Sequence, residues 1–334
     1  MNNTELVIGP LLGGGLVLGY RCSARCRHCL YACGPHRGDG HGSSGARLDD
    51  VLDALARRAP RASYHIGGGE PFLDLELLER AVAGVERRGL RLDYVETNAS
   101  WVRDEDQAEA VLERLAGAGL GCVLVSLSPF HAEGVPLRRT LALIGAARRV
   151  LPGGAFVWIE AFYEDLRRAD PAERLDLDAL LARRGDAYAV GLARRYGLVP
   201  AGRAGRYLHR HGQRIPWREA ARAADCRRRL TDTSHFHVDL DGLYVPGLCA
   251  GLALPLEQVP GSVDLERFPL LGRLVAGGLQ ALVELAAGLG FEPLPTYGSA
   301  CDLCGHARTF LAGRGDYPEL GPAGFYDPRS LSFE

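Results

Sequence analysis

The chain has 334 residues, of which 47% are hydrophobic and 24% charged, the ordinary balance of a globular protein. Its formal net charge of −2 excludes the strongly basic surface that nucleic acids or acidic membranes attract. All 39 residues counted as Lys or Arg are arginines. Chemistry that needs a lysine amine, such as Schiff-base catalysis, lysine-bound pyridoxal phosphate or a Walker-type phosphate loop, is therefore excluded.

No uninterrupted apolar run reaches the roughly 18 residues of a membrane span. The apolar N-terminal stretch lacks a basic start and is broken by Pro10 and by glycines, which argues against a signal peptide. We therefore expect a cytoplasmic protein with no membrane or nucleic-acid partner. In that compartment, nine cysteines favour metal binding over disulfides. They form one early group (Cys22, Cys26, Cys29, Cys33), one late group (Cys226, Cys249, Cys301, Cys304) and a single Cys122, expected to be a small buried side chain.

Short apolar runs alternate with amphipathic stretches over the first two thirds of the chain. We expect strands at 14–20, 62–67, 90–97, 121–128, 155–162 and 187–193, and helices around 47–59, 74–88, 104–117, 137–150 and 172–184. Such alternation indicates parallel strands joined by right-handed crossovers, in a barrel or an open α/β sheet. In both architectures ligands bind at the C-terminal ends of the strands.

The alternation stops near residue 200. A short helix over 216–224 is followed by a hairpin over 235–249 with Asp241-Gly242 as its turn, and then by an apolar helix or helix pair at 265–290. His235 and His237 share one face of the first hairpin strand, where structural roles are the simpler expectation. From Tyr317 the chain is rich in Pro and Gly and reads as a tail along the surface.

The first cysteine group directly follows the first expected strand, with the spacing Cys22-x3-Cys26-x2-Cys29. Three thiolates so close in sequence can converge on one metal centre. Structural zinc and cubane iron–sulfur clusters normally take four protein ligands, so three thiolates would leave one iron open to an outside ligand. The alternative is a zinc knuckle with Cys33 or His28 as the fourth ligand.

The second strand ends in the sequence GGGEP at 67–71. Its glycines would let a ligand approach the backbone, and its carboxylate could hold an ammonium group. Together the two motifs resemble those of the radical S-adenosylmethionine (SAM) superfamily, in the same order after the first and second strands. Cys22, Cys26 and Cys29 match the superfamily's C-x3-C-x2-C signature, and Gly68, Gly69, Glu70 and Pro71 match its GGEP motif, which binds the methionine amino group.

The resemblance extends over residues 10–205 and implies a partial (β/α)6 TIM-like barrel that binds a 4Fe–4S cluster and SAM. It implies further SAM contacts from Thr97-Asn98 after the third strand, from Ser126 in the fourth, and from Arg138 or its neighbour Arg139 for the carboxylate. The sixth strand would place Leu198 and Val199 behind the adenine. Many relatives have Asp-Gly where this chain has Ser128-Pro129.

The late cysteine group resembles the C-terminal extensions called SPASM and twitch domains, which hold auxiliary 4Fe–4S clusters. We therefore expect a barrel domain at 1–205 and a smaller cysteine-rich α+β extension at 206–334. Because only four thiols are available, a twitch-like single cluster is the better match, and a structural zinc is the alternative. The cluster ligands would be Cys226, Cys249, Cys301 and Cys304.

In this superfamily the reduced cluster cleaves SAM, and the 5′-deoxyadenosyl radical abstracts a substrate hydrogen. The resemblance implies an oxidoreductase that oxidises or cross-links a peptide, as maturases of ribosomally made peptides (RiPPs) do, or a small metabolite. Its partners would be an electron donor such as flavodoxin or ferredoxin and a separate peptide-recognition protein. The alternatives are a redox-neutral epimerase or transferase, with Cys33 as the hydrogen donor of an epimerase, and a non-catalytic iron–sulfur or zinc protein. Glu160, Tyr163 and Tyr188 are candidates for the cavity wall.

Overall fold

The computed structural model describes residues 5–37, 45–212 and 214–332. Its strands in the first part of the chain are β1 (Leu6–Ile8), β2 (Gly13–Val17), β3 (Ser63–Gly67), β4 (Arg91–Thr97), β5 (Val123–Val125) and β6 (Ala155–Phe156). Those in the last third are β7 (Ile215–Pro216), β8 (Phe236–Asp239), β9 (Leu243–Val245), β10 (Leu254–Pro255), β11 (Gly261–Val263) and β12 (Thr296–Tyr297).

Within the described residues the central feature is an eight-stranded sheet with the order β10-β9-β8-β2-β3-β4-β5-β6. The strands from β8 to β6 run parallel, and β9 and β10 add an antiparallel edge. The α/β class with a central parallel sheet is therefore confirmed. Since the C-terminal ends of parallel strands meet at one edge, the loops that follow β2, β3, β4 and β5 are brought together there.

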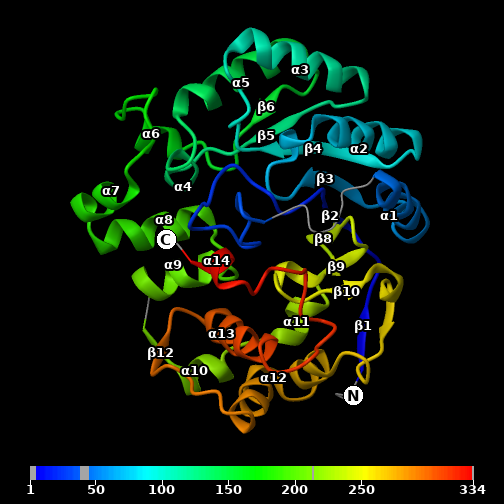
Figure 1. Ribbon diagram of the computed structural model, residues 1–334, viewed down its shortest axis with the longest axis vertical. Helices are drawn as coiled ribbons and strands as arrows, with labels where there is room; N and C mark the ends of the chain where they lie inside the picture. Colours follow the sequence, from blue (N-terminus) through cyan, green and yellow to red (C-terminus); the bar gives the residue numbers. More distant parts are fainter. Residues whose placement is uncertain (1–4, 38–44, 213, 333–334) are drawn as a thin grey trace.

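Four amphipathic helices cover the outer face of this sheet, at the expected positions (Figure 1). They are α1 (Gly45–Arg58), α2 (Leu75–Arg87), α3 (Glu105–Gly117) and α5 (Leu137–Val150). Asp74 caps α2 by accepting a hydrogen bond from the Leu77 amide at 3.0 Å, and Asp104 caps α3 in the same way. These two caps set the first residues of α2 and α3, and so set where the loops after β3 and β4 end.

Two expected strands are wrong. Only Ala155–Phe156 of the run at 155–162 is extended, and the run at 187–193 is helical, in α8 (Asp186–Tyr196). Ala189, Leu192 and Ala193 are buried at helical spacing, in a second core with Phe130 and Phe162. Short apolar runs do not distinguish a strand from a buried helix by periodicity alone. The sixth parallel strand is instead β8, which comes from the last third of the chain and lies beside β2.

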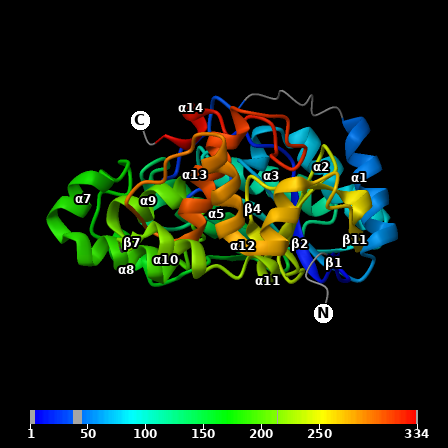
Figure 2. The ribbon, with the colours of Figure 1, turned by 90° about the horizontal axis from the view of Figure 1, so that it is seen from below.

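The remaining helices lie away from these four, at the left and in the lower part of Figure 1, and Figure 2 shows them from below. They are α4 (Pro129–Ala132), α6 (Phe162–Leu166), α7 (Leu177–Arg184), α9 (Arg203–His211), α10 (Trp217–Arg222), α11 (Cys226–Leu230), α12 (Pro269–Gly288), α13 (Ala300–Ala312) and α14 (Pro328–Leu331). The expected hairpin forms as β8 and β9, and it extends the central sheet.

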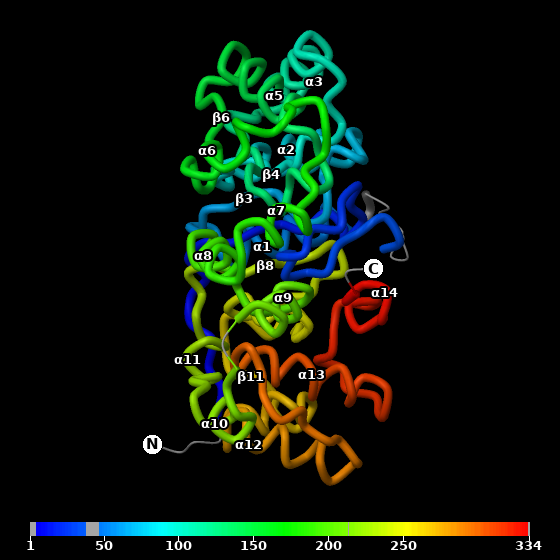
Figure 3. Tube along the Cα trace, turned by 90° about the vertical axis from the view of Figure 1, so that its left-hand side faces the viewer, coloured from blue at the N-terminus to red at the C-terminus, as the bar shows by residue number. Residues whose placement is uncertain are grey.

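By length and composition α12 is the one described helix that could cross a membrane. It packs against α10, α11 and α13, and its chain breaks from helical geometry at Gly278, as a helix pair would. A buried core helix explains its apolar character. Residues 328–332 of the C-terminal tail lie near the cysteine loop rather than beside α12, as the red segment in Figure 3 shows.

Candidate functional site

The early cysteines lie in a loop that follows β2 and folds back on itself. The Cys22 amide donates to the Gly34 carbonyl at 3.2 Å, and all nine cysteines are unpaired thiols. Burial raises the pKa of Cys22 to about 12. Burial also raises the pKa of Cys26, and the neighbouring Cys22 and Cys29 raise it further because their charges would repel the Cys26 thiolate. Because each of these anions disfavours the others, the three thiols ionise together only on a bound cation, which releases their protons on binding. The loop therefore has the donor set of a metal centre.

Cys33, the fourth cysteine of this loop, is buried beside the third. Its thiol lies 3.6 Å from the Gly68 carbonyl, and its hydrogen bond to Cys29 lowers the pKa of Cys29 to about 5. The cysteine outside both groups, Cys122, is only half-buried, with its sulfur 3.5 Å from the Gly153 carbonyl. It precedes β5, at the end of the sheet opposite the cysteine loop.

The glycines of the GGGEP segment are explained by chain packing. The Gly69 amide donates to the Gly19 carbonyl at 2.8 Å, and a Cβ on Gly69 would lie 1.8 Å from the Arg21 carbonyl oxygen. Gly68 has a φ of +132°, in the region that side chains disfavour. At these two positions the loop after β2, rather than an open ligand space, occupies the room. The effect is to hold the GGGEP segment directly against the cysteine loop.

Glu70 joins the ends of three strands. Its carboxylate accepts hydrogen bonds from the Thr97 hydroxyl at 2.8 Å and the Asn98 amide at 2.7 Å, and burial raises its pKa to about 7. The Asn98 side chain in turn donates to the Cys22 sulfur at 3.3 Å and to Ser23 at 3.2 Å. A continuous network therefore runs from the end of β3 through the end of β4 to a cysteine of the loop after β2.

The other residues that the resemblance singles out lie at varied distances from this network. Ser126 follows β5, and its amide donates to the Thr97 carbonyl at 2.8 Å, which brings it to the same edge. Arg138 is exposed on α5, whereas its neighbour Arg139 reaches back to the Ser100 carbonyl. Pro71 is buried at the start of a short 3-10 helix.

Because 187–193 is helical, Leu198 and Val199 follow a helix and not a sixth strand. Leu198 packs in the core beneath α4 and α8, and Val199 packs against the cysteine loop. Glu160 and Tyr163 are exposed, and Tyr188 is half-buried on α8 beside Arg184 and Arg195.

Sequence reasoning missed Arg203, which is completely buried beneath the cysteine loop. Its guanidinium donates to the carbonyls of Cys26 (2.9 Å), Cys33 (2.6 Å) and Ser330 (2.8 Å). These bonds tie Cys26 and Cys33 of the loop to the C-terminal tail and place a positive charge next to the thiols. One arginine among 39 basic residues carries no sequence signal of such a role.

The C-terminal tail covers the cysteine loop. Arg25 donates to the carbonyls of Arg329 and Ser332, and Arg37 donates to the Ala323 carbonyl. Ser330, which accepts from Arg203, is fully buried. The tail therefore covers one side of the cysteine loop, in which Cys22 and Cys33 are buried and Cys26 and Cys29 are half-buried.

The late cysteines line one cavity of about 610 Å³. Burial raises the pKa of Cys226 to about 12, and Cys301 and Cys304 disfavour its anion further. Arg229 and Arg308 line the same cavity and supply positive charge. The expected four thiols, Cys226, Cys249, Cys301 and Cys304, are thus brought together from α11, the loop after β9, and α13.

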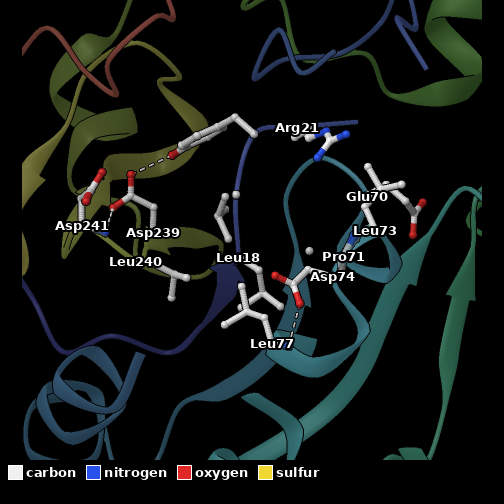
Figure 4. A pocket seen from close by; sticks show the side chains of 14 residues that line it. Leu18, Arg21, Glu70, Pro71, Leu73, Asp74, Leu77, Asp239, Leu240 and Asp241 are labelled. Carbon is white, nitrogen blue, oxygen red and sulfur yellow. Dashed lines mark hydrogen bonds between the residues drawn. The ribbon is translucent and has the colours of Figure 1, made fainter. Parts of the chain in front are cut away.

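Figure 4 shows a smaller pocket of about 150 Å³, at the ends of β2, β3 and β8. Leu18, Arg21 and Asp74 line it, and the Tyr20 hydroxyl donates to Asp239 beside it at 2.9 Å. Glu70 and Pro71 also contribute to its wall, so the GGGEP segment and the start of the cysteine loop both border this pocket.

A group of imidazoles lies on the sheet face that carries Tyr94 and Glu96. Burial lowers the pKa of His65 to about 4 and keeps that of His237 well below its ordinary value, so both rings are neutral at pH 7. The pKa of His235 is lowered as well, and burial raises the pKa of Glu96 to about 7.

No family model and no curated protein matches the chain. Among solved structures it is similar to Streptococcus suis SuiB bound to S-adenosylmethionine, with 13% identity, a TM-score of 0.40 and coverage of 96% of this chain and 78% of that one. A second SuiB structure matches with 14% identity and a TM-score of 0.39. The match covers 73% of this chain and 61% of the length of that SuiB chain. Coproporphyrinogen III oxidase (HemN) from Escherichia coli, described as a radical SAM enzyme, matches with 13% identity, a TM-score of 0.39 and coverage of 91% of each chain.

Proposed function

We propose that this chain is a radical SAM enzyme. The observation that carries the proposal is the network that links Glu70, Asn98 and Cys22, because it ties a three-cysteine loop to the ends of two neighbouring parallel strands. A zinc knuckle needs only its four ligands and no such connection to the sheet. A bound cofactor that touches the metal centre and the strand ends at once does need it.

The residues present fit a three-thiolate 4Fe–4S cluster and SAM. Cys22, Cys26 and Cys29 would hold the cluster, and the buried arginine beneath the loop would offset its negative charge. When bound and reduced, the cluster supplies the electron that cleaves SAM to methionine and a 5′-deoxyadenosyl radical. The protein's own part is to position both groups and to exclude water.

The strand-end residues would bind SAM. In this proposal Thr97, Asn98 and Ser126 offer polar groups at adjacent strand ends, and Gly68 to Pro71 form the wall against the methionine. Both Glu70 oxygens already accept hydrogen bonds from the chain, so a SAM ammonium group would share this carboxylate with Thr97 and Asn98. For the SAM carboxylate we propose Arg139 in place of the exposed Arg138.

The late cysteines would hold an auxiliary 4Fe–4S cluster in a twitch-like arrangement. The supporting observation is a cavity that four thiols and three arginines line together. A second redox centre suits net oxidation, so the proposed reaction is oxidation or cross-linking of a peptide or a small metabolite, in the cytoplasm. A flavodoxin or ferredoxin would supply electrons, and a separate protein would present a peptide substrate.

Anaerobic reconstitution followed by chromatographic measurement of 5′-deoxyadenosine tests the proposal. The wild-type protein with SAM and dithionite is expected to form it, and Cys26→Ala is expected to abolish its formation. Cys122→Ala is the matched control, because that thiol lies at the opposite end of the sheet. Cleavage that survives Cys26→Ala would refute the assignment of the early cysteines.

Iron and sulfide analysis of the Cys22/Cys26/Cys29→Ala triple variant tests the auxiliary cluster. About four irons per chain should remain if the late thiols hold a cubane cluster. Zinc in place of iron would make that site structural. An epimerase would be favoured over an oxidase if the product gained a solvent-derived hydrogen and if Cys33→Ala abolished that incorporation.

A further inference from the structure

Three histidines meet on one face of the central sheet, between the two cysteine groups. His65 of β3 and His237 of β8 are both in register with Gly15 of β2, which lies between those strands. His235 stands two residues before His237 and shares its face. The ring centroids of the three imidazoles form a nearly equilateral triangle, with sides of 5.1, 5.2 and 5.3 Å.

Gly15 makes this meeting possible. A Cβ on Gly15 would lie 2.5 Å from Nε2 of His65 and 2.5 Å from Cδ2 of His237. Any side chain there would therefore push the two imidazoles apart. With glycine in the middle strand, side chains from the two flanking strands reach each other across it.

The distances match those of a metal site. Nε2 of His65 lies 3.3 Å from Nε2 of His237, and one ring nitrogen from each of the three histidines lies within 4.8 Å of the other two. Two nitrogens bound to one tetrahedral zinc at about 2.0–2.1 Å are separated by about 3.3–3.4 Å.

We propose that His65, His235 and His237 bind a divalent metal ion, with zinc as the best match, and leave one coordination position open. Three neutral imidazoles with a fourth position free form a donor set that zinc uses in catalytic sites. Glu96 lies nearby, with its Oε1 3.7 Å from Nε2 of His65, and could accept a proton from a ligand bound at the metal.

The surroundings assign the open position to a substrate. His235 lines the cavity of the late cysteines, and Tyr31, two residues after Cys29, packs edge-on against His237 at 5.2 Å. The metal would thus lie between the two proposed clusters, where β2 and β8 run side by side (Figure 1). It would anchor a substrate through an oxygen donor such as a carboxylate or hydroxyl. This substrate role rests on the proposed function, whereas metal binding does not.

Zinc analysis of the cluster-loaded protein tests metal binding without any reliance on SAM cleavage. After incubation with zinc and removal of the excess, one zinc per chain is expected in addition to the iron. His65→Gln and His235→Gln should lose it and keep their iron, which shows that the variants are folded; His235 is exposed, so its replacement should leave the fold intact. His211→Gln, on α9, is the control and should keep the zinc. Equal zinc in all four proteins, or none in the wild type, would overturn the site.

X-ray absorption at the zinc edge tests the ligands and the open position, and iron clusters do not interfere with it. The wild-type spectrum should fit imidazole nitrogens without sulfur, and acetohydroxamate should add oxygen neighbours. Sulfur ligands would overturn the assignment to histidine. An unchanged spectrum with acetohydroxamate would overturn the substrate role. A wild-type protein that binds zinc but forms no 5′-deoxyadenosine would count against the proposed function alone.

Discussion

Replacement of Arg203 by methionine should loosen the cysteine loop. The guanidinium makes three hydrogen bonds, to the carbonyls of Cys26, Cys33 and Ser330. Bonds from a charged donor contribute about 1.5–3 kcal/mol each, and removal of the costly buried charge returns part of that sum. A net loss of about 3 kcal/mol in the ordered loop is expected, which corresponds to more than a 100-fold fall in its population.

The assay is the iron content of Arg203→Met after anaerobic reconstitution, followed by the rate of iron loss to a chelator. Arg206→Met is the matched control, because Arg206 lies on the same helix and is exposed. Arg203→Lys should fall between the two, since an ammonium group keeps the charge but not the fork of donors. Equal iron content and equal rates in Arg203→Met and Arg206→Met would refute the claim that this side chain orders the loop.

Three further predictions concern other contacts. Asn98→Ala removes the 3.3 Å hydrogen bond to the Cys22 sulfur, so the reduction potential of the early cluster should fall, because such bonds stabilise the reduced form; an unchanged potential in a redox titration followed by electron paramagnetic resonance would contradict this. Burial raises the pKa of Glu319 above its ordinary 4.5, so the folded state binds this proton more tightly, and stability should fall as pH rises from 4.5 through the raised pKa. Glu319→Gln should flatten that part of the profile of melting temperature against pH, and an identical slope would count against it. Gly15→Ala should lower zinc binding by the three-histidine site while iron is retained, because its Cβ would lie 2.5 Å from the imidazoles; zinc content at the wild-type level would argue against the site.

Much of the fold could be predicted because its signals are local. Caps such as Asp74 and Asp104, together with buried residues at helical spacing, mark the helices that cover the sheet. The runs that became β2 to β5 were recognisable for their apolar content. From that alternation follows the prediction that loops after successive strands share one edge, and the bond from Asn98 to Cys22 bears it out.

What could not be predicted depends on contacts between distant segments. The run at 187–193 has the composition of a strand, yet Leu192 and its neighbours are buried in a helical core. Its place in the parallel sheet goes to β8, whose partner β2 is more than 200 residues away in sequence. His65 becomes a neighbour of His237 only through that pairing. Arg203 likewise gains its partners only when the tail and the cysteine loop close over it.

The most direct test of the central claim is the electron paramagnetic resonance spectrum of the reduced protein with and without SAM. If Cys22, Cys26 and Cys29 leave one iron open, SAM should shift the signal of one cluster, and the triple alanine variant of these cysteines should lack that response. The unaffected part of the signal should persist in that variant, from the late cysteines. An identical spectrum with and without SAM in the iron-loaded wild-type protein would contradict the account.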